Sequence, residues 1–117
     1  MREIKFRAWH RSAGIMSRVF DLFGYGNIHQ EMDLNACNVM QYTGLKDKNG
    51  QGTEMCQGDI VFASGHGNGV VEKNNWGEWG LKYQDDFIPI HDLVMEGDLG
   101  EIKGNIHENP ELLEQQK

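Results

Sequence analysis

The chain has 117 residues, 38% of them hydrophobic, and a formal net charge of -7, which suits one ordinary domain with a single core. It contains no run of about eighteen apolar residues, and charges alternate through its first ten positions, so we expect neither a membrane-spanning helix nor a secretory signal. Cys37 and Cys56 are too few for a disulfide scaffold and lack the CxxC spacing of a zinc or redox site, which indicates reduced, structural thiols in a cytoplasmic protein.

The charge is unevenly distributed along the chain. Residues 1 to 18 hold five basic residues against Glu3 alone, a net charge of +4. Because the whole chain carries -7, residues 19 to 117 carry -11. The acidic total argues against a general affinity for nucleic acid, which needs surplus Lys and Arg to release counterions. This separation of charge has two interpretations. The basic segment of one subunit could contact the acidic part of another subunit, or the two parts could pair within one monomer. The basic strip consists of Arg2, Lys5, Arg7, Arg11 and Arg18.

The N-terminal segment predicts a β-hairpin. "EIKFRAW" alternates apolar side chains with Lys5 and Arg7, which is the pattern of a half-buried strand. "SAG" turns the chain, and "IMSRVFDLF" favours a strand over a helix, so we expect a hairpin from residue 3 to about residue 23. The following "GYGNIHQEMDLNACN" has no clear period and predicts an irregular connection.

The central stretch "QYTGLKDKNGQ" combines Gly, Lys, Asp and Asn as a phosphate or cation site would. It follows "NVMQYT", which predicts a strand ending at Gly44, and precedes a strand within "EMCQGDIVFAS". Asn49-Gly50 is a strong reversal signal, and the stretch matches neither a P-loop nor an EF-hand. We therefore interpret it as a turn.

The C-terminal half predicts further short strands at about residues 69 to 74, 79 to 84 and 87 to 90, and a last one in "GEIKGNIHE". Pro89 indicates an edge strand or a bulge, because proline cannot donate to a ladder. "ENPELLEQQK" predicts a short helix or a frayed tail. With helix signals confined to this end, the sequence predicts a mostly β protein: an SH3-type small barrel with an additional N-terminal β-hairpin region and a short C-terminal helix or tail.

Four segments resemble, in order, the YopX-like family of small phage and prophage proteins: "MREIKFRAW", "MQYTGLKDKNG", "GDIV" and "IKGNIHENPELL". The chain departs from the family pattern at His10, at His107 and in the residues before Gly58. The resemblance implies an SH3-type barrel with added strands, homo-oligomerisation and expression in a bacterial cytoplasm, and it implies no enzyme activity. We expect one YopX-like domain over residues 1–117, with a hairpin extension (1–38), a barrel-like core (39–108) and a tail (109–117).

Motifs for catalysis or metal binding are not found. The histidines at positions 10, 29, 66, 91 and 107 lack the spacing of paired ligands on a helix, although His66, His91 and Asp59 could converge at a barrel rim. Cys56 or Ser64 beside His66 could form a nucleophile with a base, but nothing in the pattern activates either one. We expect no metal, no cofactor and no catalytic residues.

The aromatic group Trp76, Trp79 and Tyr83 has two interpretations. These side chains could fill a small core, or they could line a partner groove rimmed by Asp85 and Asp86. The first hypothesis for function is accordingly a non-enzymatic phage or prophage binding or assembly module that acts through self-association or a phage or host protein. The second is a nucleic-acid accessory protein that uses the basic strip, and the third is a small metal-dependent hydrolase.

Overall fold

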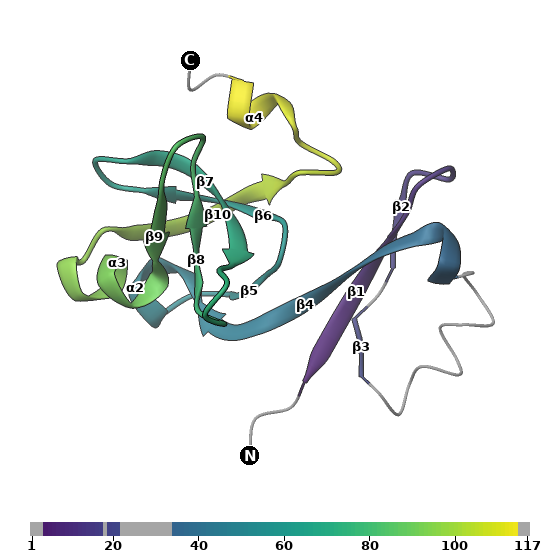
Figure 1. Ribbon diagram of the computed structural model, residues 1–117, viewed down its shortest axis with the longest axis horizontal. Helices are drawn as coiled ribbons and strands as arrows, with labels where there is room; N and C mark the ends of the chain where they lie inside the picture. The colour runs from purple at the N-terminus through teal and green to yellow at the C-terminus, as the bar shows by residue number, and fades with distance from the viewer. Residues whose placement is uncertain (1–3, 18, 22–33, 115–117) are drawn as a thin grey trace. The chain divides into compact units, whose positions relative to one another are not determined.

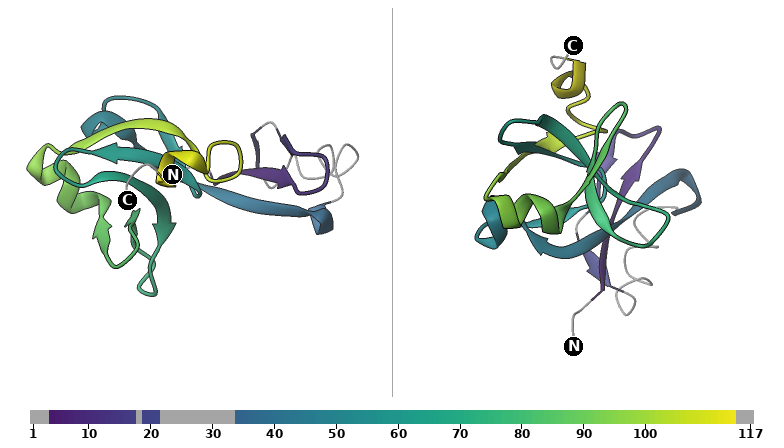
Figure 2. Two further views of the ribbon diagram at one scale, coloured as in Figure 1. Left: turned by 90° about the horizontal axis from the view of Figure 1, so that it is seen from above. Right: turned by 60° about the vertical axis from the view of Figure 1, so that its left-hand side comes forward.

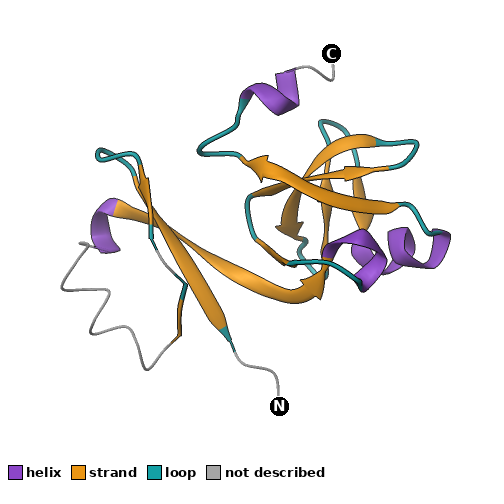
Figure 3. Cartoon of the chain, turned by 180° about the vertical axis from the view of Figure 1, so that it is seen from behind, coloured by secondary structure: helices purple, strands orange, loops and turns teal. Residues whose placement is uncertain are grey.

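The computed structural model describes residues 4–17, 19–21 and 34–114, and half of the described residues lie in strands (Figures 1 and 3). The strands are β1 Lys5–His10, β2 Ile15–Met16, β3 Phe20–Asp21, β4 Cys37–Lys46, β5 Glu54–Cys56, β6 Asp59–Ala63, β7 Gly67–Lys73, β8 Trp79–Lys82, β9 Phe87–Pro89 and β10 Leu99–Asn105. The helices are η1 Leu34–Ala36, α2 Asp47–Gly50, α3 Ile90–Glu96 and α4 Glu111–Glu114. The prediction of a mostly β fold with a short C-terminal helix is confirmed.

The chain divides into two compact units, residues 1–44 (the first unit) and 45–117 (the second unit). Each unit packs around its own group of buried side chains. The expected organisation as one domain with boundaries at residues 38 and 108 stays a prediction.

In the first unit, β1 pairs antiparallel with β2, β3 and β4. The β1–β2 pairing, with Trp9 opposite Met16, forms the expected N-terminal hairpin. Alternation along β1 turns Phe6 and Ala8 to one face, where Ala8 is fully buried and the rings of Phe6 and Phe20 lie 5.9 Å apart. Residues 18 and 22–33, which include the end of the predicted hairpin and most of the predicted connection, lie outside the described residues.

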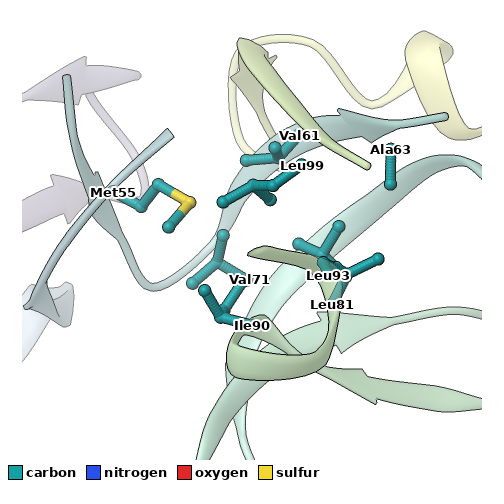
Figure 4. Packing of buried hydrophobic residues seen from close by; sticks show 8 residues of the cluster. All are labelled: Met55, Val61, Ala63, Val71, Leu81, Ile90, Leu93 and Leu99. Carbon is teal, nitrogen blue, oxygen red and sulfur yellow. The ribbon is translucent and has the colours of Figure 1, made fainter. Parts of the chain in front are cut away.

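The second unit contains a five-stranded antiparallel sheet in the order β10-β6-β7-β8-β9, which the views in Figure 2 show as curled. Its inner face is the alternating apolar set of these strands, and the side chains converge as Figure 4 shows. The buried cluster comprises Met55, Val61, Ala63, Val71, Leu81, Ile90, Leu93 and Leu99. The curl is compatible with the predicted SH3-type barrel, which stays a prediction.

The expectation that helix would be confined to the C-terminal end is wrong, because α3 follows β9 directly. Ile90 and Leu93 lie three positions apart and are both buried against the sheet, so packing selects a helix here. Gly97 ends the helix in the left-handed conformation with φ of 75°, and its amide donates to Val94 O. Pro89 lies where it was expected, at the end of edge strand β9, and it also precedes the first turn of α3.

Candidate partner-binding surface

The stretch of residues 41 to 51, which resembled a phosphate or cation site, forms a turn whose side chains bind main-chain groups of the second unit. β4 continues past Gly44 to Lys46, and the chain then reverses through Lys48 and Asn49, whose φ angles are 54° and 58°. The buried Asp47 carboxylate accepts hydrogen bonds from Thr53 N (2.6 Å) and Ile102 N (2.8 Å). The predicted turn is confirmed, and each oxygen of its Asp47 carboxylate accepts a main-chain amide.

Asn49 makes a second fastening between this turn and the strand β10. Its Nδ2 donates to Gly97 O, and its Oδ1 accepts from Leu99 N, both at 3.1 Å. One side chain therefore satisfies an acceptor and a donor on either side of Asp98.

The "GDIV" segment is also structural. Asp59 is only 3% exposed, and its Oδ2 accepts from Cys56 N at 2.8 Å, which closes the turn between β5 and β6. Gly58 adopts φ of 88°, and its carbonyl accepts from Ile106 N. Asp59 is therefore engaged in this turn, which does not support the possible convergence of Asp59 with His66 and His91 at a barrel rim.

The "KGNIHENP" segment folds back on two asparagines. Asn105 Oδ1 accepts from the amides of His107 (3.0 Å) and Glu108 (2.9 Å), and Asn109 Oδ1 accepts from Asn105 N at 3.2 Å. A Cβ on Gly104 would lie 2.4 Å from Asn109 Oδ1, so this position needs glycine. The segments that carry the family resemblance thus include side chains that organise turns.

The turn between β7 and β8 presents Trp76 to solvent. Trp76 is 86% exposed, whereas the turn beneath it is fixed: Asn74 Oδ1 accepts from both Trp76 N and Glu78 N at 2.9 Å. Asn74 N also donates to Glu78 O, and Gly77 takes the required positive φ of 82°. A large apolar side chain is therefore held outward on an ordered turn.

A hollow of about 390 Å³ lies beside this turn on the outer face of the sheet. The Phe87 ring that lines the hollow packs over the buried Gly80, where a Cβ would meet the ring at 2.4 Å and Ile88 O at 2.6 Å, so only glycine leaves room for it. We call Trp76 and the residues lining the hollow the tryptophan surface. The lining residues are Glu72, Lys73, Asn74, Asn75, Lys82 and Phe87.

The structure separates the other two aromatic residues of the predicted group from Trp76. Trp79 and Tyr83 pack against the buried cluster, and Lys73 Nζ lies 4.9 Å from the centre of the Trp79 ring. The Tyr83 hydroxyl donates to Gly67 O at 3.0 Å. Burial, with a smaller contribution from the charge of Asp86, raises the pKa of Tyr83 to about 12.

Asp85 and Asp86 form the neighbouring turn between β8 and β9, and both are exposed. Asp86 Oδ1 accepts from Phe87 N, and Asp86 O accepts from Tyr83 N, each at 2.8 Å. This turn adds acidic side chains to the same antiparallel hairpins that carry the tryptophan surface.

Three members of the basic strip lie in the described part of the first unit. Lys5 Nζ and Arg7 Cζ lie 5.6 and 5.9 Å from the centre of the Tyr42 ring. The Arg11 guanidinium donates to Asn38 Oδ1 and Asn35 O. Arg2 and Arg18 lie outside the described residues. The described cations thus contact groups of their own unit, and the nucleic-acid role stays a prediction.

Sequence reasoning missed one side-chain cluster. His66 lies with Glu96 and Asp98, and one donor atom from each falls within 4.8 Å of the others. Glu96 and Asp98 flank Gly97, which ends α3. Prediction of a helix ending at this glycine would have brought the two acidic residues into one turn. Of the other histidines, His10 Nδ1 accepts from Ala13 N at 3.0 Å, His91 is exposed on α3, and His29 lies outside the described residues.

The suggested nucleophiles gain no support from their positions. Cys56 is completely buried, so its thiol is not accessible to a substrate. Ser64 is exposed, and its amide donates to Asp98 O at 2.8 Å. Within residues 4–17, 19–21 and 34–114, no helix is long and apolar enough to cross a membrane.

Comparisons with known proteins agree with the resemblance of the four segments. The model of a family described as YopX protein matches residues 20–114. The crystal structure of protein EF1440 from Enterococcus faecalis is similar to 94% of this chain and 97% of that chain, with a TM-score of 0.62 and 26% sequence identity. None of the curated proteins matches the chain.

Proposed function

The chain belongs to the YopX family of small phage- and prophage-type proteins, which has no known catalytic role, and from that premise we propose that it is a non-enzymatic binding module. The observation that carries the proposal is Trp76, a large apolar side chain 86% exposed on a turn fixed by Asn74. Exposed tryptophans beside hollows are frequent anchors of protein interfaces, and fixing the turn in advance reduces the entropy lost on binding. We place this work in the cytoplasm of a bacterial host cell.

The occupant we propose for the tryptophan surface is a second copy of the chain. The hollow and the turns at the two ends of β8 carry four acidic side chains, Glu72, Glu78, Asp85 and Asp86, against Lys73 and Lys82 in the hollow, a net charge of -2. Residues 1 to 18 of another copy carry a net +4 and so offer the opposite charge. Opposite charges would orient the two copies, and burial of Trp76 would supply most of the affinity.

The test is the mass of the full chain by light scattering over a wide range of protein concentration. We expect an oligomer for the wild type, a shift to monomer for Trp76→Ala, and weaker association as salt increases. Met95→Ala is the matched control, because Met95 is also a large exposed apolar residue, 74% exposed, but lies on α3. A Trp76→Ala variant that keeps the wild-type mass would contradict the assignment of the surface.

A monomeric wild type would remove self-association and leave other proteins as the partners. The proposal then requires that affinity capture from host cells retains a protein on the wild type and loses it with Trp76→Ala. Equal capture by both would refute a binding role for this surface. Retention of the wild type on nucleic acid at low salt, lost when Lys5, Arg7 and Arg11 are replaced by Ala, would instead favour the accessory role.

A further inference from the structure

His66 is positioned by the turn between β6 and β7. Its amide donates to Ala63 O at 3.0 Å, and Gly65 and Gly67 on either side have φ of 80° and 85°. The Tyr83 hydroxyl holds the same turn through its hydrogen bond to Gly67 O, and the rings of His66 and Tyr83 lie 6.4 Å apart. The imidazole is thus exposed on a backbone that is fixed at both ends.

Glu96 and Asp98 are positioned by the connection from α3 to β10. Gly97 between them turns the chain out of the helix, and Asp98 N donates to Leu93 O at 2.9 Å. Asn49 bonds Gly97 O and Leu99 N, so the connection is fastened immediately before and after Asp98.

A main-chain hydrogen bond joins the two segments directly. Ser64 N donates to Asp98 O at 2.8 Å, which brings the turn that carries His66 against the connection that carries Glu96 and Asp98. The three donor atoms consequently lie within 4.8 Å of one another, with His66 and Glu96 exposed and Asp98 half-buried. Donors on a zinc ion, at bonds of about 2.0 to 2.2 Å, lie roughly 3.4 Å apart, so side-chain rotations alone would bring these three to bonding distance.

We propose that His66, Glu96 and Asp98 form a site for a divalent transition-metal cation, with Zn²⁺ as the ion of best fit. One imidazole and two carboxylates suit zinc, whereas Mg²⁺ and Ca²⁺ select sets of oxygen ligands. Three protein ligands leave a fourth position open towards solvent. The bound ion clips the β6–β7 turn to the α3–β10 connection, where hydrogen bonds already join them.

The proposed metal site is independent of the tryptophan surface, because its ligands come from different turns of the second unit. The proposal has two measurable consequences. The chain binds one equivalent of zinc through these three side chains, and zinc stabilises the folded state by binding it in preference to the unfolded chain.

The experiment titrates Zn²⁺ into the untagged, chelator-treated full chain by calorimetry, with Co²⁺ absorption as a second reading of the ligand set. We expect one equivalent for the wild type, a loss of affinity of at least about tenfold for His66→Ala and Asp98→Asn, and a smaller loss for Glu96→Gln. His91→Ala, which removes an exposed histidine on α3, keeps the wild-type affinity. Mg²⁺ at the same concentrations does not compete.

Thermal unfolding separates a metal site from a structural role of the same residues. Zinc raises the midpoint of the wild type and of His91→Ala but leaves that of His66→Ala unchanged, while the metal-free midpoints of all three agree closely. The proposal is overturned if the wild type takes up no stoichiometric zinc, or if His66→Ala binds as tightly as the wild type. It is equally overturned if His91→Ala abolishes binding.

Discussion

One oxygen of the Asp47 carboxylate accepts a hydrogen bond of 2.8 Å from the main-chain amide of Ile102, which lies 55 positions further along the chain. The other oxygen accepts a hydrogen bond from the amide of Thr53. This side chain joins the turn after β4 to the strand β10 and replaces solvent for two amide donors. These hydrogen bonds also affect stability, because a buried amide or carboxylate left without a hydrogen-bond partner raises the free energy of the folded state.

We expect Asp47→Ala to lower the free energy of unfolding by about 2 to 4 kcal/mol, because two charge-assisted hydrogen bonds are lost and two amides are left without acceptors. Asp47→Asn is no rescue, since its single carbonyl oxygen serves one amide and its NH2 group faces the other. Urea denaturation measures both. Asp85→Asn, an exposed acid in the β8–β9 turn, is the control and leaves stability nearly unchanged. Wild-type stability of Asp47→Ala would show that the two bonds contribute nothing.

Lys48 is a site of backbone strain that glycine would relieve. Its φ of 54° is unfavourable for a residue with a Cβ, and its ion pair with Glu101, 3.8 Å long and exposed, contributes little. Lys48→Gly should therefore raise stability by about 0.5 to 1 kcal/mol.

Glycine at either of two nearby positions should instead lower the stability. Lys46→Gly should destabilise the protein, because Lys46 has extended backbone with φ of -103° and glycine only adds freedom to the unfolded chain. Asn49→Gly relieves the same left-handed strain but removes the bonds to Gly97 O and Leu99 N, so a net loss is expected. If Lys48→Gly and Lys46→Gly shift the denaturation midpoint equally, the account of strain is wrong.

The two neighbouring tryptophans should differ sharply in their contribution to stability. Trp79→Ala removes a ring packed against the buried cluster and should cost about 2 to 4 kcal/mol. Trp76→Ala removes a ring that is 86% exposed and should change stability by no more than about 0.5 kcal/mol. Chemical denaturation of the two variants at concentrations where association is negligible makes the comparison. Equal losses would place Trp76 in the core and remove the basis of the tryptophan surface.

Tyr83 should make the protein sensitive to alkali. Its folded-state pKa is raised to about 12, above the ordinary value of about 10, because burial disfavours the phenolate. The resulting contribution to stability is complete below the ordinary pKa and is lost as the pH rises through the interval between the two values. Denaturation at closely spaced pH values above 9 should show this decline.

Tyr83→Phe is the control for the alkaline decline. It loses the hydrogen bond to Gly67 O, so it is less stable at neutral pH, but it has no phenol to titrate. Its stability should fall less steeply over the alkaline interval than that of the wild type. Parallel curves for the two proteins would assign the decline to other groups.

The strands of the second unit could be predicted because their residues alternate and their turns carry glycine or Asn-Gly. The helix α3 could not, since "FIPIHDL" contains an apolar run that also fits a strand, and only the packing of Ile90 and Leu93 together distinguishes the two. Missing α3 also hid the turn at Gly97, so Glu96 and Asp98 could not be placed beside His66.

The aromatic group shows how far a local pattern reaches. Core filling was one of the two interpretations of the group, and it holds for Trp79 and Tyr83, which pack against the cluster that contains the buried Leu81. Trp76 precedes the strand and belongs to the turn, so its exposure depends on where β8 begins, which the sequence pattern defines least well. The links from Asp47 and Asn49 to β10 were beyond a local interpretation, because Ile102 lies 55 positions from Asp47 and Leu99 lies 50 positions from Asn49.

The side chains of Asp47 and Asn49 have one more consequence for the sheet they close. β10 is its outermost strand on one side, and the amides of Leu99 and Ile102 would otherwise offer a template for the strand of another molecule. Because these two donors are already occupied, growth of the sheet by addition of strands at β10 is blocked there. We therefore expect the turn after β4 to disfavour fibrillar pairing at this edge as well as shaping the fold.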